Sequence, residues 1–190
     1  MNKTVEKEVK ELIKKEFLNC SIREFQDKVN WGYISLDQKL SESFIREFKD
    51  RVNWYCISEH QELSESFIRE FKDKVSWRYI SAYQKLSENF IREFKDKVFW
   101  GYISEHQELS ESFIREFKDE VNWDCITFYQ KFSENLYEEF KDRININYLK
   151  KNKNININIE IKTKVIFKNS GKKKKIVNNR FDRFEILDIR

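Results

Sequence analysis

Residues 47–69 read EFKDRVNWYCISEHQELSESFIR, and residues 70–92 follow at once with EFKDKVSWRYISAYQKLSENFIR. The same phrase recurs before and after these copies, and its tryptophans lie 23 residues apart without insertion, at Trp31, Trp54, Trp77, Trp100 and Trp123. A fixed interval over several copies is typical of a solenoid, in which each unit is too small to bury its own apolar face and packs on its neighbours. The sequence therefore predicts a repeat array.

Each unit contains one helical pattern after its serine. Phe67, Ile68, Phe71 and Val75 fall on one face of a helix, and Ser64 is a good N-cap. The opposite face is charged, and we expect ion pairs between residues four apart, at 65 and 69, 69 and 73, and 70 and 74. The pattern predicts a longer helix over residues 64–75.

A shorter helix is predicted to begin at the tryptophan. Asn53 is a capping residue, Trp54 and Ile57 are three residues apart, and the polar residues at 61 and 62 end the pattern. The unit is then a short and a long helix, and the fold class is an all-α, α/α solenoid. An alternative interpretation takes VNWYCIS as a strand, which gives a β/α solenoid resembling leucine-rich repeats.

The copies should share one continuous core. Each contributes a Trp, an Ile, a Leu, two Phe and a Val, and the absence of proline favours short polar turns between helices. The residues expected to form this repeat core are the five tryptophans, together with Phe48, Phe71, Phe94 and Phe117.

The two ends depart from the phrase. Residues 1–16 are predicted to form a cap helix whose apolar stripe comprises Val5, Val9, Leu12, Ile13 and Phe17. Residues 17–149 form the array, whose sixth copy has Ile146 in place of the tryptophan.

Residues 150–190 change pattern. Isoleucine alternates with polar residues over 155–161, which predicts a strand continuing towards Phe167, and residues 184–189 are expected to pair back as the second strand of a β-hairpin. A two-stranded ribbon is marginally stable alone, so we expect this tail to dock on the array, pair with a partner or remain partly disordered.

Charge is divided between array and tail. The net charge of +4 over 190 residues combines 24 Lys/Arg and 29 Asp/Glu in residues 1–143 with 13 Lys/Arg and 4 Asp/Glu in residues 144–190.

No apolar run resembles a signal peptide or a membrane span, so we expect no membrane association and an intracellular protein.

The three cysteines form no CxxC motif. Cys56 and Cys125 share a repeat column with tyrosines, which favours a role as half-buried spacers in a reducing compartment.

No catalytic, cofactor-binding or metal-binding constellation can be assembled. His60 and His106 are 46 residues apart, too far in a solenoid to share a metal, and are interpreted as surface turn residues. The glutamine column containing Gln61 is assigned to satisfying backbone groups at turns and helix ends, and the aspartate column containing Asp73 to ion pairs within its own helix. We therefore expect a protein that is not an enzyme and binds no cofactor.

The tail carries the one basic cluster. Lys172, Lys173, Lys174, Lys175 and Arg180 are candidates for contact with nucleic-acid phosphates or another anion, and the four lysines also match a nuclear-import signal. Aromatic residues are sparse around them, so a solvated loop is the alternative interpretation.

The phrase Trp-x-x-Ile-Ser-x-x-Gln-x-Leu-Ser-Glu-x-Phe-Ile-Arg-Glu-Phe-Lys-Asp-Lys-Val, as at residues 77–98, resembles a short repeat found in uncharacterised proteins of large DNA viruses. The resemblance covers about residues 17–149 and implies no activity. A viral source would place the protein in the host cytoplasm.

The sequence thus favours a non-catalytic scaffold that mediates protein–protein interaction through an unknown partner, with a nucleic-acid-associated protein acting through its tail as the alternative. An enzyme ranks third. Function is expected in the columns that vary between copies, such as Tyr55 against Gly32, Arg78 and Asp124, or His60 against Tyr83, and in the tail.

Overall fold

The computed structural model describes residues 1–154, 165–167, 173–175 and 187–188. Its first helix, α1, spans Lys3–Lys15, and the four-residue α2 spans Phe25–Lys28. The later helices are α3 (Trp31–Asp37), α4 (Glu42–Glu47), α5 (Trp54–His60), α6 (Glu65–Glu70), α7 (Trp77–Tyr83), α8 (Glu88–Glu93), α9 (Trp100–His106), α10 (Glu111–Glu116), α11 (Trp123–Tyr129), α12 (Glu134–Phe140) and α13 (Ile146–Leu149).

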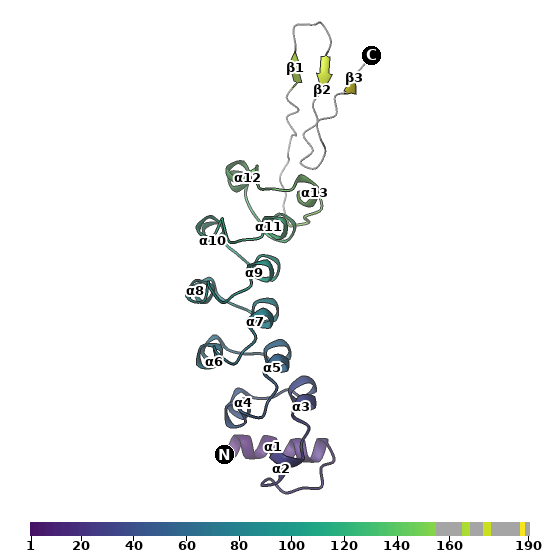
Figure 1. The fold of residues 1–190 in the computed structure, drawn as a ribbon, viewed down its shortest axis with the longest axis vertical. Coiled ribbons are helices and arrows are strands. Elements are labelled where there is room, and N and C mark those ends of the chain that lie inside the picture. The colour runs from purple at the N-terminus through teal and green to yellow at the C-terminus, as the bar shows by residue number, and fades with distance from the viewer. Residues whose placement is uncertain (155–164, 168–172, 176–186, 189–190) are drawn as a thin grey trace.

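The helices from α3 onward form two columns (Figure 1). In one column α3, α5, α7, α9, α11 and α13 each contact the next; we call these the inner helices, because the array bends gently with this column on its inner side. The helices α4, α6, α8, α10 and α12 form the opposite column and are called the outer helices. The predicted all-α solenoid of 23-residue units is confirmed.

Side-chain caps fix where the helices begin. The Asn53 Oδ1 accepts hydrogen bonds from the backbone N–H groups of Tyr55 and Cys56 at 3.0 and 3.3 Å, which starts α5. The Ser64 Oγ accepts the N–H of Phe67 at 3.2 Å and starts α6. The predicted caps are therefore confirmed, and the alternative strand over VNWYCIS is wrong because Trp54–Ser58 belong to α5 and Asn53 caps it.

The outer helices are shorter than the sequence pattern predicts. Regular helix ends at Glu70, and Phe71 follows with φ −112° and ψ 27°; a hydrogen-bonded turn then carries the chain on, with the N–H of Val75 donating to the Phe71 carbonyl at 3.0 Å. The Phe71 ring packs 4.9 Å from the Trp54 ring and 4.7 Å from the Phe67 ring. The sequence predicted a short inner helix and a longer outer helix. This prediction is wrong, since the inner helix has seven residues and the outer helix has six.

The most deeply buried core residues are the apolar pair of each outer helix and the isoleucine of each inner helix. Phe67, Ile68 and Ile57 are fully buried, as are their counterparts in the neighbouring copies. The predicted core residues Phe71 and Phe94 are also buried, whereas Phe48 and Phe117 are half-buried and pack against the core.

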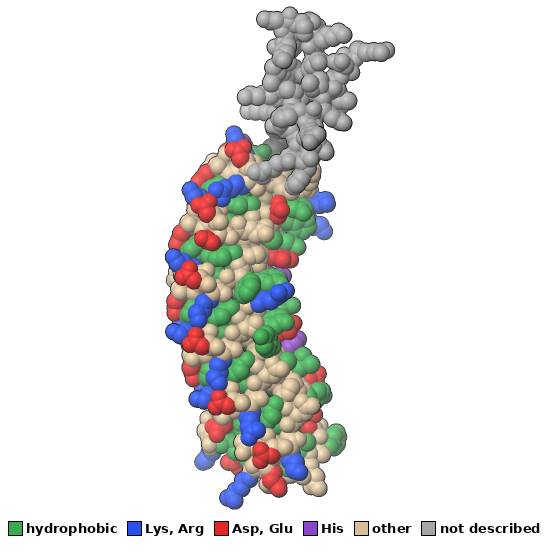
Figure 2. All heavy atoms as spheres, in the orientation of Figure 1, with side chains coloured by type: hydrophobic (Ala, Val, Ile, Leu, Met, Phe, Trp, Pro, Cys, Tyr) green, Lys and Arg blue, Asp and Glu red, His purple; other side chains and the backbone are tan. Residues whose placement is uncertain are grey.

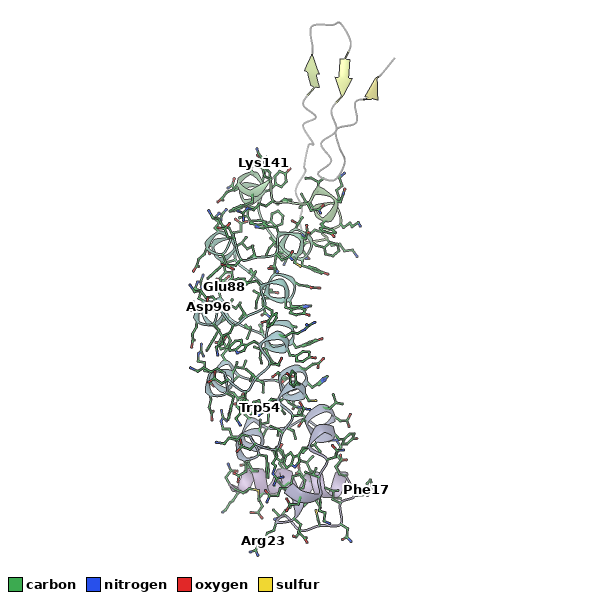
Figure 3. The ribbon with its side chains drawn as sticks, viewed as in Figure 1. Phe17, Arg23, Trp54, Glu88, Asp96 and Lys141 are labelled. Carbon is green, nitrogen blue, oxygen red and sulfur yellow. The ribbon has the colours of Figure 1, made fainter. Side chains whose placement is uncertain are left out.

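The tryptophans are half-buried, which corrects the prediction that they form the core itself. Each indole packs against the core but also donates its Nε1–H to a backbone carbonyl five residues earlier, as Trp54 does to Lys49 at 2.9 Å. An indole needs a partner for its N–H when it is buried, and a position at the core boundary supplies one. Figure 3 shows Trp54 between the two columns.

A buried glutamine joins each repeat to the one before it. The Gln61 Nε2 donates to the carbonyls of Ser35 and Gln38 at 3.1 and 2.8 Å, and its Oε1 accepts the N–H of Leu40 at 2.8 Å. Gln84, Gln107 and Gln130 repeat these three bonds. The predicted role of the glutamines is confirmed, and the backbone that they satisfy belongs to the preceding copy.

A second ladder joins the outer helices. The Arg69 Nε donates to Glu93 Oε2 in the next copy at 2.7 Å, and its guanidinium lies 4.9 Å from the centre of the Phe90 ring. The expected pair of Arg69 with Glu65 is confirmed at 3.6 Å. Asp73, however, pairs with Lys97 of the next copy, so the expected pairing of this aspartate column within its own helix is wrong.

The first helix caps the array with side chains. Val5, Val9 and Leu12 are buried, and the Glu8 carboxylate accepts the N–H of Ser41 at 2.9 Å, as an outer-helix glutamate does at later junctions. Gln38 contacts Lys15 and Glu16 instead of backbone carbonyls.

Phe17 does not belong to the apolar stripe, which corrects that prediction. It is 94% exposed and has a positive φ of 51° (Figure 3). The N–H of Leu18 bonds the Ile13 carbonyl and the N–H of Phe17 bonds the Lys14 carbonyl, a Schellman termination that usually places glycine at this position. The termination brings Leu18, rather than Phe17, against the core.

The last junction extends beyond the final helix. The Asn152 Nδ2 donates to the carbonyls of Thr127 and Gln130 at 2.8 and 2.9 Å, which reproduces the two donor bonds of the glutamine column. Asn152 is buried although it lies one position away from the repeat register. The polar contacts of the array therefore continue past Leu149.

The described residues of the tail form three short strands, β1 (Val165–Phe167), β2 (Lys173–Lys175) and β3 (Leu187–Asp188). β1 pairs antiparallel with β2, and β2 pairs antiparallel with β3. The tail does contain a β-hairpin, but β1 and β2 form it. The expected pairing of residues 184–189 with the strand that reaches Phe167 is wrong, because β3 pairs with the lysine strand β2. The isoleucine alternation over residues 155–161 lies outside the described residues.

Candidate functional site

Several polar residues that recur from copy to copy have partners at the junctions. Besides the glutamines, Ser58 accepts the N–H of Ser76 in the next copy at 2.9 Å, and Glu65 accepts the N–H of Ser87 at 2.7 Å. These side chains hold neighbouring copies together, and their polar atoms already have partners. Positions that differ between copies are therefore the first candidates for contact with another molecule.

Each repeat exposes one large aromatic side chain on or beside its inner helix. We call these residues the aromatic stripe: Tyr33, Tyr55, Tyr83, Phe99, Tyr129 and Tyr148, which are between 36% and 68% exposed. Figure 2 shows hydrophobic side chains following one another along the concave edge of the array, whereas charged side chains line the convex edge. The stripe is therefore the main exposed apolar feature of the inner helices.

Neighbouring members of the stripe are connected through half-buried aromatic rings. Tyr79 lies between Tyr55 and Tyr83, with ring centroids 6.3 and 6.1 Å apart. Phe128 similarly contacts both Tyr129 and Tyr148, at 4.7 and 5.9 Å. Such contacts order the rings before any partner binds, which lowers the entropy cost of binding.

The fourth repeat continues this surface. Phe99 lies 6.5 Å from Tyr102, and Tyr102 stacks on His106 at 6.0 Å. The guanidinium of Arg78, from the preceding repeat, lies 5.5 Å from the centre of the Tyr102 ring.

Carboxylates accompany the aromatic rings. Asp37, Glu59, Glu105 and Asp124 all belong to inner helices, whose described residues contribute Arg78 as their one Lys or Arg. Hydrogen bonding to Asp37 raises the pKa of Tyr33, and hydrogen bonding to Glu105 raises the pKa of Tyr129. The inner helices therefore combine aromatic rings with negative charge.

The two histidines and two of the cysteines, Cys56 and Cys125, lie singly on the inner helices, whereas Cys20 lies between α1 and α2. His60 is exposed beside Glu59, with 3.5 Å between its Nε2 and the carboxylate, and His106 lies 3.9 Å from Glu105. Their predicted place at the surface is confirmed, but they are not turn residues, because His60 and His106 are the last residues of α5 and α9. Cys20, Cys56 and Cys125 are free and half-buried, as expected for Cys56 and Cys125, and burial is the first cause that raises the pKa of the Cys125 thiol.

The part of the chain that the structure describes contains no group of three or more His, Cys, Asp or Glu residues arranged to hold a metal ion. None of its helices has the length and apolar character needed to cross a bilayer.

Of the predicted anion-contact residues in the tail, Lys173, Lys174 and Lys175 form β2, so these three do not lie in the alternative solvated loop. Lys172 and Arg180 lie outside the described residues.

The chain resembles none of the known proteins with which it was compared. No family model, no curated protein and no solved structure matches it.

The sequence predicted that function lies in the columns that vary between copies, but it did not show how these positions lie in space. Tyr55, Tyr83 and Arg78 were singled out because they vary between copies, and they do lie on the inner helices. Phe99 and Tyr148 were missed. Phe99 replaces a capping residue, and a large aromatic at a cap position was the signal that could have revealed it.

Proposed function

We propose that the array is a non-catalytic scaffold that mediates protein–protein interaction through the surface of its inner helices. The observation that carries this proposal is the aromatic stripe, with one exposed aromatic side chain in each of six repeats. Exposed apolar patches that extend over several elements are characteristic of interaction sites, and aromatic residues are enriched in protein interfaces.

The ladders on the outer helices support this assignment. Four arginines of the outer helices each donate a hydrogen bond to a glutamate of the next copy: Arg46, Arg69, Arg92 and Arg115. These side chains of the outer surface join neighbouring repeats and already have partners. The resemblance to repeats of large DNA viruses adds the proposal that the partner is met inside a host cell.

An affinity capture with the full chain tests the proposed function. The triple variant Tyr55→Ala, Tyr83→Ala and Phe99→Ala removes three exposed rings that do not belong to the buried core. A matched control removes three exposed lysines that follow the outer helices, by Lys49→Ala, Lys72→Ala and Lys95→Ala. Proteins captured by the natural chain and by the lysine variant should be lost from the aromatic variant. Equal capture by all three would contradict the use of this surface.

A second candidate function rests on the charge of the tail. Residues 144–190 carry 13 Lys/Arg against 4 Asp/Glu, and three of these lysines lie together in β2. The proposal is a nucleic-acid-associated protein that contacts phosphates through the tail, and a nuclear location through residues 172–175 belongs to it. A salt titration of binding to a duplex DNA or RNA probe tests it, with Lys173→Gln, Lys174→Gln and Lys175→Gln as the variant. The affinity should fall steeply with salt and the slope should decrease in the variant; salt-independent or undetectable binding removes this candidate.

A further inference from the structure

We propose that the inner helices bind the basic tail of a second copy of this chain, so that copies associate from tail to array. This inference rests on the proposed function and names the partner. It is carried by the opposite charges of array and tail, by the apolar groups that both present, and by the exposure of the aromatic stripe in the single chain.

Array and tail carry opposite net charge. Residues 1–143 have 24 Lys/Arg against 29 Asp/Glu, whereas residues 144–190 have 13 Lys/Arg against 4 Asp/Glu. The described strands of the tail lie at one end of the molecule, since Figure 1 shows β1, β2 and β3 beyond α12 and α13. An elongated molecule with opposite charges in its two parts attracts further copies of itself, because complementary potentials steer association.

The negative charge of the inner surface gathers at α9 and α11. Residues 100–122 contain six Asp/Glu and two Lys/Arg, and of these carboxylates Glu105 lies on α9, while Asp124 lies on the neighbouring α11. Burial and then the charges of Glu105 and Asp124 raise the pKa of the Cys125 thiol, so both carboxylates lie near one position on α11. Asp124 is exposed and Glu105 is partly exposed, so a cation from outside can reach both.

Lysines also occur in the turns after α7 and α11, at Lys85 and Lys131. The inner surface is therefore not acidic along its whole length. The pair of carboxylates on α9 and α11, rather than the whole surface, is the expected contact for the lysines of the tail.

Aromatic rings accompany this pair of carboxylates. The hydroxyl of Tyr129 is hydrogen-bonded to Glu105, and the Phe128 ring lies 4.7 Å from the Tyr129 ring. The tail offers matching chemistry, because isoleucine alternates with polar residues over 155–161 and three lysines follow in β2. A segment that contains both apolar and cationic side chains can cover the rings and pair with the carboxylates at once.

The exposure of the stripe indicates that the occupant comes from a second copy. In the single chain Tyr55, Tyr83 and Tyr129 are 68%, 60% and 43% exposed. The Asn154 Nδ2 donates to the Tyr129 carbonyl at 2.9 Å, so the tail begins near the C-terminal end of the stripe, and β1 to β3 lie beyond the array (Figure 1). A tail that covers these rings therefore belongs to another molecule.

A contact from tail to array joins two unlike surfaces. Each association leaves one free array and one free tail, so it continues into open chains or closes into a ring rather than stopping at a dimer. Ion pairs between exposed side chains are screened by salt. The inference thus predicts species larger than a dimer that dissociate as the salt concentration rises.

Sedimentation equilibrium of the full chain tests this association. In about 0.05 M salt the mean mass should rise with protein concentration beyond that of a dimer, and in about 0.5 M salt it should fall towards that of the monomer. A chain that stays monomeric at every concentration in low salt would overturn the inference. An association that salt leaves unchanged would overturn it as well.

Two variants alter the two sides of the contact. The surface variant combines Glu105→Gln with Asp124→Asn, and the tail variant combines Lys173→Gln, Lys174→Gln and Lys175→Gln. Each variant alone should associate about tenfold more weakly than the natural chain, as expected for the loss of two or three exposed ion pairs. Full association of either variant would contradict the assigned contact.

A matched control keeps the same amount of charge change away from the inner helices. Asp96→Asn with Asp142→Asn removes two exposed carboxylates of the aspartate column, where Asp96 lies on the α8 side of the array (Figure 3). This variant should associate as the natural chain does. Thermal melts followed by circular dichroism check that every variant keeps its fold.

Mixing the surface variant with the tail variant distinguishes a contact between unlike surfaces from a contact between like surfaces. The surface variant keeps a natural tail and the tail variant keeps a natural array, so the mixture restores one contact. It should form a dimer and stop there, because the two remaining surfaces are the altered ones. A mixture that associates no more than its components would overturn the assignment of tail to array.

The results also separate this inference from the proposed function. If the natural chain is monomeric while the affinity capture still depends on the aromatic residues, the inference fails and the scaffold function stands with a different partner. If the capture does not depend on these residues either, both fail.

Discussion

The central junctions of the array and its two ends solve the same packing problem with different residues. Between central copies, Gln84 bonds two carbonyls and one N–H of the preceding repeat. At the N-terminal end α1 takes the place of a full preceding repeat, and Gln38 contacts the charged side chains of Lys15, the last residue of α1, and Glu16, its C-cap. At the C-terminal end a shorter amide, Asn152, takes the donor role of the glutamine.

This difference shows what a repeat junction requires. The apolar side chains would tolerate many neighbours, but the buried carbonyls and N–H groups of each turn need partners in fixed places, because an unpaired buried polar group costs about 1–3 kcal/mol. The glutamine supplies these partners when another copy is present. At the two ends of the array, other residues supply the equivalent hydrogen-bonding groups.

Truncation of a central core residue should have the largest effect. Phe90 is fully buried between copies on both sides, and Phe90→Ala should lower the free energy of unfolding by about 3–5 kcal/mol. Hydrogen exchange should show lost protection in the repeats on both sides. Leu136→Ala, near the end of the array, should instead lower the protection from hydrogen exchange of the last repeat alone. Equal and global loss of protection in both variants would contradict the comparison between centre and end.

Loss of the glutamine bonds should be the next largest effect. Gln84→Leu keeps the volume but leaves the Ser58 and Gln61 carbonyls and the Leu63 N–H without partners, at a cost of about 3 kcal/mol. Urea denaturation measures this.

The equivalent change at the C-terminal end, Asn152→Leu, should cost about 1–2 kcal/mol, because it leaves two carbonyls unpaired near the edge of the array. A Gln84→Leu variant as stable as the natural chain would show that the ladder contributes nothing net.

Phe17→Gly should stabilise the N-terminal end. The positive φ of Phe17 is unfavourable for a residue with a Cβ atom, and its ring is almost fully exposed, so glycine removes strain without removing packing. The expected gain is about 1 kcal/mol, measured by urea denaturation. Phe17→Ala, which keeps the Cβ atom, is the control and should gain little. A destabilised glycine variant would indicate that the ring has a structural role in the cap.

The contact between α10 and the N-terminus of α12 should respond to acid, with the smallest effect of the four. Burial would raise the pKa of Glu111, but hydrogen bonds from the Ser133 N–H and hydroxyl and from Arg115 outweigh burial and lower it. Because this pKa is lower in the folded than in the unfolded chain, ionised Glu111 stabilises the fold at neutral pH. The contribution is lost as the pH falls from the ordinary value of 4.5 through the lowered one.

Glu111→Gln should therefore be less stable than the natural chain at pH 7, and the difference should shrink as the pH falls through this range. Glu138→Gln, which removes an exposed carboxylate from the next outer helix, controls for charge alone. A constant difference between pH 7 and pH 3 would contradict the role of the Glu111 carboxylate.

The sequence by itself determined the repeat length, the helical class and the caps, because these depend on local spacing and on side chains that bond their own backbone. Trp54 and Ile57 fall on one helical face whatever their neighbours are, and Asn53 and Ser64 cap within three residues. The division of charge between array and tail is likewise a property of composition.

Only the tertiary structure decided which partner each repeated polar residue meets. Gln61 bonds residues more than 20 positions earlier and Arg69 bonds one 24 positions later, and no local pattern fixes such distances. The same holds for the functional surface. Tyr55 and Tyr83 are separate variations in the sequence, and the stacking of inner helices joins them into one stripe through Tyr79, whose ring centroid lies 6.3 Å from that of Tyr55 and 6.1 Å from that of Tyr83.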